Sequence, residues 1–212
     1  MKAHHHVVGV LLAGGLARRM GGGDKCLQPL GGETMLARAI ARARPQVDSL
    51  ILNANGDPAR FEGCGVPVVA DVVEGYAGPL AGILTAMDWA HAHAPDHETI
   101  ASFPTDAPFF PDDLVETMLE ARRQAGALLA CAASRGRTHP VFGIWPVGLR
   151  DDLRAALENG ERKIDRWTEK FPIVTVEFAG VGIDPFFNVN TPDDLAEAES
   201  FLREQAGRGV RR

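Results

Sequence analysis

Glycines and cationic residues are concentrated in one short stretch near the start of the chain. Residues 7–25 read VVGVLLAGGLARRMGGGDK, an apolar run followed by a polar loop with two arginines and a lysine. Glycines at the end of a strand let the backbone approach a ligand, and consecutive N–H groups form a concave site for anions. Arginine and lysine add the positive charge that a polyphosphate requires. The stretch predicts a phosphate-binding loop, the alternative being a glycine-rich surface turn with solvated charges.

The spacing differs from that of the two commonest phosphate-binding loops. A P-loop places Gly-Lys-Ser/Thr directly before a helix, whereas Cys26 and Leu27 follow Lys25. A dinucleotide-binding fingerprint needs G-x-G-x-x-G, and the residues around Gly14 and Gly15 break that spacing. The loop therefore belongs to another class of phosphate site.

Polar residues follow four apolar runs that have the composition of strands. The first run leads into Gly14, the second ends at Asn53, the third reaches Asp71, and the fourth passes through Thr105 to Asp106. In an open α/β sheet, ligands bind at the carboxyl ends of the strands, near the switch in strand order. We expect one composite site, although Asn and Asp are also common turn formers and caps. A lone carboxylate with substrate phosphates and water is how Mg²⁺ is usually held, which makes Asp106 the metal candidate.

Strand-like and helix-like segments alternate along the whole chain and must position these residues. The expected strands are 7–12, 49–53, 66–70, 100–103, 127–133, 141–145 and 173–178. The expected helices are 34–44, 79–92, 112–124, 147–158, 162–170 and 192–205. This alternation predicts one α/β domain with a mostly parallel, twisted sheet and helices on both faces.

Length and composition set the broad class of protein. The 212 residues suffice for one well-buried domain, which we place at residues 1–206, with a flexible tail at 207–212. The net charge of −6 argues against nucleic acid or an anionic membrane as a partner, since both favour a basic face. The chain shows no signal-peptide pattern, no membrane-spanning apolar run and only three scattered cysteines, so we expect a cytoplasmic protein. The histidine run at 4–6 is interpreted as a lead-in to the first strand.

The glycine loop resembles the LxGG-x-x-RRMGG-x-DK signature of Rossmann-like nucleotidyltransferases, and most closely that of the molybdenum cofactor guanylyltransferases (the MobA family). Three further segments resemble that family in the same order: YAGPLAGI at 76–83, FPTDAPFFP at 103–111 and FFNVNTPDDL at 186–195. Thr105 stands where many members have cysteine, a change expected to affect packing but not chemistry. The resemblance implies a Rossmann-like fold and transfer of GMP from Mg·GTP to the terminal phosphate of molybdopterin, with or without molybdenum, and release of pyrophosphate.

The resemblance also implies roles for individual residues. Lys25 and the glycine loop would hold the triphosphate, Arg19 would stabilise charge on the departing pyrophosphate, and Asp106 would hold Mg²⁺. The segment 139–143 lies where the resemblance places the molybdopterin-facing half. The residues expected to bind the nucleotide are Leu12, Ala13, Gly14, Gly15, Lys25, Asn53, Asp71, Gly78 and Asp106. The residues expected to face the second substrate are Asn188, Asn190, Arg162 and Lys163.

Several alternatives stay open at this point. Arg162 and Lys163 also fit a solvated basic pair, and the run from Asn190 to Pro192 also fits the start of a helix. The chain as a whole could be a related cytidylyltransferase, a sugar-phosphate nucleotidyltransferase, or a non-catalytic nucleotide-binding protein that delivers cofactor. Those transferases typically show A-A-G where this chain has A-G-G, which favours guanine, and the pairing of a lysine with a metal carboxylate favours catalysis. We expect transient contact with molybdoenzymes or other proteins of cofactor biosynthesis. We do not expect a covalent nucleophile in the chain.

Overall fold

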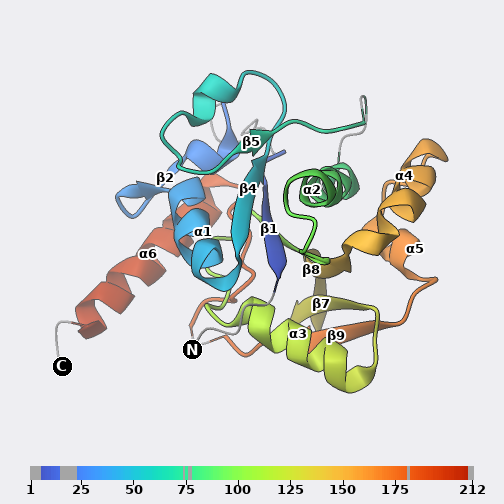
Figure 1. The fold of residues 1–212 in the computed structure, drawn as a ribbon. Coiled ribbons are helices and arrows are strands. Elements are labelled where there is room, and N and C mark those ends of the chain that lie inside the picture. Colours follow the sequence, from blue (N-terminus) through green and yellow to red (C-terminus); the bar gives the residue numbers. More distant parts are fainter. Residues whose placement is uncertain (1–5, 15–22, 74, 76–77, 181, 210–212) are drawn as a thin grey trace.

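The computed structural model describes residues 6–14, 23–73, 75, 78–180 and 182–209 of the chain. Its strands are β1 (Val7–Leu12), β2 (Pro29–Leu30), β3 (Glu33–Thr34), β4 (Ser49–Asn53), β5 (Val68–Val69), β6 (Thr99–Pro104), β7 (Leu129–Ser134), β8 (Arg137–Pro146) and β9 (Ile173–Glu177). Its α-helices are α1 (Met35–Ala43), α2 (Pro79–His93), α3 (Leu114–Ala125), α4 (Arg150–Glu158), α5 (Ile164–Thr168) and α6 (Pro192–Gly209). Figure 1 shows their arrangement around a central sheet.

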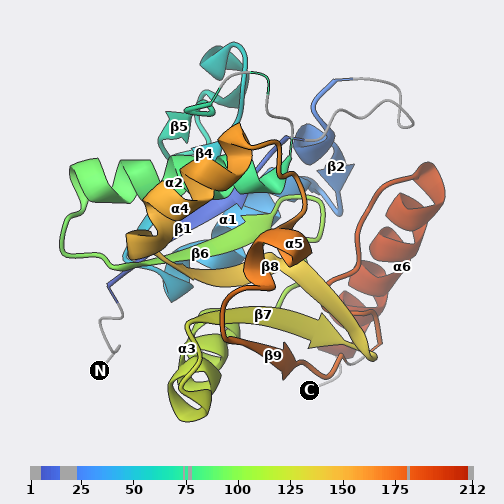
Figure 2. The same cartoon turned by 90° about the vertical axis from the view of Figure 1, so that its right-hand side faces the viewer.

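Seven strands form this sheet in the order β5-β4-β1-β6-β8-β7-β9. Neighbouring strands are parallel except at β8, which runs antiparallel to both β6 and β7. Helices α1 and α3 pack on one face, whereas α2 and α4 cover the other (Figure 2). The predicted fold class, a mostly parallel α/β sheet with helices on both faces, is confirmed.

Strand β1 lies at the centre of the sheet and feeds two separate hydrophobic cores. Successive side chains of a strand point to opposite faces, so Val7 and Leu11 pack with α1 and α3 while Val8 and Val10 pack with α2 and α4. This burial on both faces explains the continuous apolar run before the glycine loop. It also makes the carboxyl end of β1 a rigid support for the loop that begins there.

The carboxyl ends of four parallel strands are aligned in one row. In the ladder, Leu12 pairs with Asn53 on one side and with Pro104 on the other, and Asn53 pairs with Val69. The chain moves outward from β1 through β4 to β5 and then returns to the other side of β1 at β6. The switch in strand order therefore lies between β1 and β6, where a ligand site is expected.

Strand β8 departs from regular pairing in its first half. Along β7 the partners change from Gly143 at Cys131 to His139 at Ala132, so one step on β7 matches four on β8. Residues 140–142 are thus bulged out of the ladder, and such bulges redirect side chains. The expected strand 141–145 covers part of this bulge and the regularly paired residues that follow it, whereas β8 as a whole runs from Arg137 to Pro146.

Several other elements differ from their expected bounds. The third strand is only Val68–Val69, shorter than the expected 66–70. The backbone N–H groups of Arg162 and Lys163 donate to the Glu161 carboxylate, so helix α5 begins later, at Ile164. Helix α6 continues to Gly209, into the segment expected as a tail. Among the described residues, no helix is both long enough and apolar enough to cross a membrane.

Candidate active site

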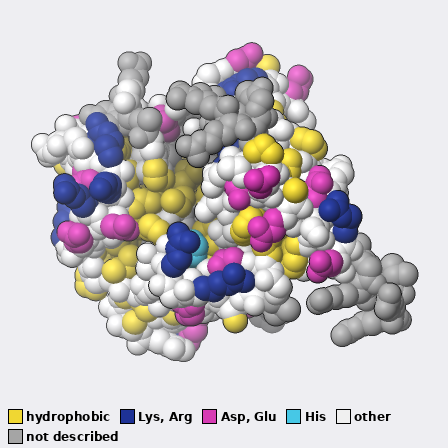
Figure 3. Space-filling view, turned by 180° about the vertical axis from the view of Figure 1, so that it is seen from behind, with side chains coloured by type: hydrophobic (Ala, Val, Ile, Leu, Met, Phe, Trp, Pro, Cys, Tyr) yellow, Lys and Arg dark blue, Asp and Glu magenta, His cyan; other side chains and the backbone are white. Residues whose placement is uncertain are grey.

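A cavity of about 560 Å³ opens at the carboxyl edge of the sheet, over the ends of β1, β4 and β6. The space-filling view shows a hollow with hydrophobic side chains on its floor and a histidine beside basic side chains at its edge (Figure 3). The lining residues are Leu12, Gly14, Lys25, Asn53, Ala54, Asn55, Asp71, Gly78, Pro79, Pro104, Thr105, Asp106, Arg137, Thr138, His139, Pro140, Val141, Phe142 and Asn188.

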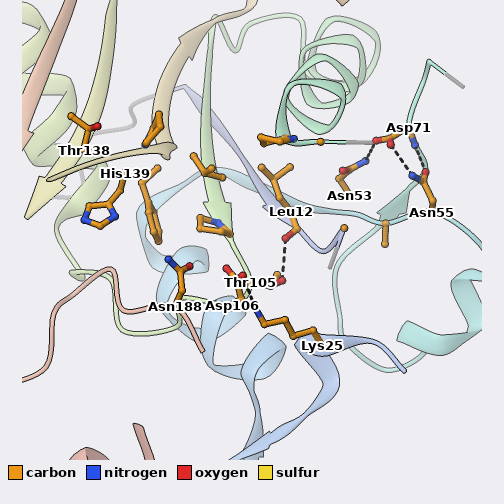
Figure 4. Close-up of a pocket in the computed structure, with 18 of the residues that line it drawn as sticks. Leu12, Lys25, Asn53, Asn55, Asp71, Thr105, Asp106, Thr138, His139 and Asn188 are labelled. Carbon is orange, nitrogen blue, oxygen red and sulfur yellow. Dashed lines mark hydrogen bonds and ion pairs between the residues drawn. The ribbon is translucent and has the colours of Figure 1, made fainter. Parts of the chain in front are cut away.

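The cavity has two chemically different ends with a charged centre between them (Figure 4). We call Asn53, Asn55 and Asp71 the β4–β5 end, because they lie at or beyond the ends of these strands. We call residues 137–142 the β8 end. The centre holds Lys25, from the segment after β1, and Asp106, from the segment after β6.

The β4–β5 end is a network of amides around one carboxylate. The Nδ2 atom of Asn53 donates to Asp71 Oδ1 at 2.9 Å, and Nδ2 of Asn55 donates to Asp71 Oδ2 at 2.7 Å. The backbone N–H of Asp71 donates in return to Asn55 Oδ1 at 2.8 Å. Each carboxylate oxygen accepts one of these side-chain bonds and can accept more, so a pair of ligand donors could be bound here.

A close helix contact holds Asn53 in place from behind. Gly82 of α2 packs directly against it, since a Cβ atom added at Gly82 would lie 2.4 Å from Asn53 Oδ1 and 2.5 Å from Leu12 Cδ2. The glycine in the segment G-P-L-A-G is therefore required by packing against the site. Gly78, at the start of α2, has φ +143°, a conformation that side-chain-bearing residues rarely adopt.

The centre of the cavity is an ion pair with an amide oxygen on it. The Lys25 ammonium lies 2.7 Å from Asp106 Oδ2 and also donates to Asn190 Oδ1. Lys25 is only 7% exposed, because the short helical turn that begins with it folds under the site. Beside it, the Thr105 hydroxyl donates to the Leu12 carbonyl at 3.0 Å and joins the ends of β6 and β1.

Asn190 combines the two interpretations that its sequence allowed. The backbone N–H groups of Asn190 and Thr191 donate to the Asp194 carboxylate, and the N–H of Asp194 donates to the Thr191 hydroxyl. This reciprocal pattern caps the start of α6. The cap leaves the Asn190 side chain pointing at Lys25, so a structural helix start also delivers a site residue.

The β8 end is aromatic and carries one imidazole. His139 lies over Phe186 with ring centroids 4.7 Å apart, and Phe142 packs against the same ring at 4.7 Å. The Ser134 hydroxyl lies 2.8 Å from His139 Nε2 and from one oxygen of Asp184. Burial lowers the pKa of His139, so its ring is neutral at neutral pH.

The structure brings most of the predicted nucleotide-binding residues to the cavity wall. Those that line it are Leu12, Gly14, Lys25, Asn53, Asp71, Gly78 and Asp106. Asn188, predicted to face the second substrate, lines it as well. Ala13 is buried next to them, and its backbone N–H donates to the Asn53 carbonyl at 3.0 Å. Gly15 and Arg19 lie outside the described residues.

Arg162 and Lys163 do not line the cavity. The Arg162 guanidinium donates to the carbonyls of Leu157 and Glu161, and its own carbonyl faces Gly78. Their role toward a second substrate stays a prediction.

Three polar lining residues went unrecognised in the sequence, as did the neighbouring Ala54. Asn55 follows Asn53 by two positions, and the polar run after β4 is a signal that could have found it. Arg137 and Thr138 belong to the turn-proximal part of β8, where nothing local in the sequence marks them as site residues.

Cys26 lies behind Lys25 and does not supply a nucleophile. It is 2% exposed, and burial together with the Asp24 carboxylate raises the pKa of its thiol to about 12. A thiol with this pKa is protonated at neutral pH and unreactive.

The chain is similar to a well-populated group of proteins. Residues 9–172 match the family model described as the MobA-like NTP transferase domain. A protein of Rhodopseudomonas palustris named molybdenum cofactor guanylyltransferase is 54% identical over 200 residues, which cover 94% of this chain and 95% of the relative. One of the same name from Rhizobium meliloti is 42% identical over 199 residues, covering 91% of this chain and 90% of the relative.

Solved structures share the fold at lower identity. Molybdopterin-guanine dinucleotide biosynthesis protein A from Archaeoglobus fulgidus superposes with a TM-score of 0.72 at 21% identity, covering 93% of this chain and 99% of that one. The 4-diphosphocytidyl-2C-methyl-D-erythritol synthase from Anaerococcus prevotii reaches the same TM-score of 0.72 at 12% identity, covering 93% and 96%. The fold is therefore common to proteins named for different nucleotides. By its family model and its relatives, the chain belongs to the MobA-like NTP transferases, a family of nucleotidyltransferases.

Proposed function

We propose that this enzyme transfers GMP from GTP to the terminal phosphate of molybdopterin, or of the metal-loaded cofactor, and releases pyrophosphate. The main observation behind this proposal is one cavity with three parts. Its centre holds the Lys25–Asp106 ion pair, one end holds the Asp71 carboxylate with free acceptor positions, and the other end has an aromatic wall. The names of the relatives at 54% and 42% identity support the same reaction.

The β4–β5 end supports guanine as the base. Guanine presents two adjacent donors, N1–H and the N2 amino group, and the Asp71 carboxylate has free acceptor positions on both oxygens. Cytosine offers one amino group next to an acceptor nitrogen, which a carboxylate cannot satisfy. A site whose polar groups are left unpaired rejects the wrong ligand strongly.

The donor set at the centre fits Mg²⁺. The oxygens of Asp106 and Asn190 converge on one cation, the Lys25 ammonium, so the cluster already accommodates positive charge. The described residues hold no group of three or more His, Cys, Asp or Glu side chains that could bind a metal, and Mg²⁺, which keeps much of its hydration shell, does not require one. Asp106 would hold the ion, which would supply neutralisation of phosphate charge.

The protein's own part in the reaction is alignment and charge compensation. A phosphate oxygen of the acceptor attacks the α-phosphorus of GTP, the bond to the β-phosphate breaks, and pyrophosphate leaves with the electron pair. Lys25, freed from Asp106 when the nucleotide binds, would place its ammonium on the phosphates as the negative charge on the leaving group grows. No covalent intermediate is needed.

The test is pyrophosphate release by the full chain supplied with molybdopterin, Mg²⁺ and one nucleoside triphosphate at a time. We expect release with GTP and at most a small fraction of that rate with CTP. A preference for CTP would identify a cytidylyltransferase, and tight GTP binding without release would identify a delivery protein. The proposal also includes a cytoplasmic location, which the free thiols of Cys26, Cys64 and Cys131 support. It further includes transient contact with molybdoenzymes or other proteins of cofactor biosynthesis.

A further inference from the structure

The β8 end contains a buried polar chain that the proposed reaction does not use. Ser134, the last residue of β7, is 1% exposed, and its hydroxyl lies between the His139 imidazole and the Asp184 carboxylate. Its distances are 2.8 Å to His139 Nε2 and 2.8 and 2.9 Å to the two oxygens of Asp184. The order is imidazole, hydroxyl, carboxylate, with the serine in the middle. In a catalytic triad the imidazole lies in the middle and activates the hydroxyl, so this serine is not arranged as a nucleophile.

Counting protons along this chain determines the form of the imidazole. The partners of Asp184 are all donors: the Ser134 hydroxyl, the Phe186 N–H at 2.8 Å and the Arg135 guanidinium at 3.6 Å. A carboxylate surrounded by donors serves as the acceptor for each of them. The single Ser134 proton therefore goes to Asp184. The serine oxygen must then accept from Nε2–H of His139, which leaves the lone pair of the neutral ring on Nδ1.

Nδ1 is available to a ligand. His139 lines the cavity, and no residue in the described part of the chain makes a hydrogen bond to its Nδ1. Burial and the nearby Arg137 lower the pKa of the ring, against the opposing effect of Asp184 and Glu177. In a neutral imidazole with a fixed tautomer, only one ring nitrogen, here Nδ1, can accept a hydrogen bond.

An acceptor at this position selects the chemistry of its partner. Phosphate oxygens are acceptors too, so a phosphate group gains nothing from Nδ1. The cavity wall next to it includes the apolar side chains of Pro140, Val141 and Phe142. A planar heterocycle that carries N–H groups on its edge fits both features, and the pterin ring of molybdopterin is such a group.

We propose that Ser134 and Asp184 hold His139 as the tautomer whose Nδ1 accepts a hydrogen bond from the N–H edge of the pterin ring of the second substrate. The inference rests on the proposed function for the identity of that substrate. Ser134 and Asp184 are positioning residues, and His139 is the contact.

The tautomer can be measured without turnover. In the full chain labelled with ¹⁵N-histidine, His139 is identified among the seven histidines by its loss in His139→Gln, and a long-range ¹H–¹⁵N spectrum reports which nitrogen carries the proton. We expect protonation at Nε2 only, a mixture of tautomers in Ser134→Ala, and recovery in Ser134→Thr, which keeps the hydroxyl. Adding molybdopterin should shift the Nδ1 resonance of the wild type, whereas GTP should not.

The kinetic consequence is confined to one substrate. Ser134→Ala should raise the KM for molybdopterin about tenfold, with the KM for GTP unchanged. The control is Ser102→Ala. It removes another buried hydroxyl, which donates to the carbonyl of Val141 on β8, the strand that also carries His139. Protonation at Nδ1 in the wild type, an unchanged tautomer in Ser134→Ala, an Nδ1 resonance that ignores molybdopterin, or an equal effect of Ser102→Ala would overturn the inference. Failure of the proposed function would instead appear as a wild type that binds molybdopterin at His139 but releases no pyrophosphate.

Discussion

The two ends of the cavity are built in different ways. At the β4–β5 end, parallel strands stop in register. The polar residues lie at a strand end, as Asn53 does, or two positions beyond it, as Asn55 and Asp71 do. At the β8 end, an antiparallel strand bulges out of the sheet. Its imidazole is held by Ser134 across the hairpin, and Asp184 from a distant loop accepts the hydrogen bond of that serine. One end is assembled from local sequence, the other from long-range contacts.

This difference in construction sets how far the residues of each end can change without disturbing the fold. The carboxyl edge of a parallel sheet is rigid, because its strands are buried on both faces, and it suits a constant ligand such as a nucleotide. A bulged strand can change its exposed residues without disturbing the core ladder, since the extra residues make no pairs. In the proposed function, the β4–β5 end would select the nucleotide and the β8 end the acceptor.

Asp106→Ala should have the largest effect, because the centre serves both ends. Loss of the carboxylate removes the expected metal ligand and leaves the buried Lys25 ammonium without its ion pair. We expect turnover to fall on the order of a thousandfold with the fold intact. Asp112→Ala is the matched control, since its carboxylate is exposed and pairs with Arg42 on the surface. Near-normal pyrophosphate release by a folded Asp106→Ala would show that the metal is held elsewhere.

Lys25→Ala should lower kcat on the order of a hundredfold and change the KM for GTP much less. A charge that compensates the leaving group acts chiefly in the transition state. Lys25→Arg should recover part of the rate, because a planar guanidinium does not replace a compact ammonium. Steady-state kinetics with Lys170→Ala as a surface control decide the matter. An unchanged kcat with a raised KM would assign Lys25 to ground-state binding only.

Gly82→Ala should damage the β4–β5 end alone. The new Cβ would push Asn53 and Leu12, which lie 2.4 and 2.5 Å from its position, and so displace the partner of Asp71. We expect the KM for GTP to rise about tenfold while the KM for molybdopterin stays constant. Gly148→Ala is the control, since its Cβ would meet nothing within 4 Å. Equal changes in both KM values would mean that the two ends are not independent.

Asn55→Ala should reduce base discrimination by a smaller factor. Asn55 exchanges two hydrogen bonds with Asp71, one from its amide and one to its side-chain oxygen, and so orients the carboxylate. ITP lacks the N2 amino group of GTP, and the preference for GTP over ITP should fall about fivefold. Asn159→Ala makes the same chemical change at the end of α4, away from the cavity. A preference that stays at the wild-type value would remove Asn55 from base recognition.

Deletion of Met1 to His6 should affect neither end. Strand β1 begins at Val7, and chain termini usually tolerate truncation. Activity with Mg²⁺ and the Tm should match those of the full chain. A rate loss that Zn²⁺ restores and Mg²⁺ does not would instead assign the histidine run to a metal site.

The sequence by itself determined the elements and half of the site. Strands β1 and β4 have the predicted bounds, because a strand buried on both faces must be apolar along its length and must end where polar residues begin. The same rule predicted that Asn53, Asp71 and Asp106 would meet, since parallel strands end at one edge. Each of these inferences uses only the burial of a segment and the residues directly after it.

The tertiary structure decided the direction of β8, its bulge and the contacts that cross the chain. Hydrophobic periodicity reports which side of a segment is buried but not its neighbour, its direction or its register. Asn190 meets Lys25 across 165 positions, and Asp184 meets Ser134 across 50. Such pairs arise only when the sheet order and the docking of α6 place the two segments together. In the sequence, the β8 end was marked only by the resemblance of segment 139–143, and the Ser134–Asp184 contact behind it appears in the folded chain alone. Asn53 and Asp71 of the β4–β5 end were already visible as polar residues at strand ends.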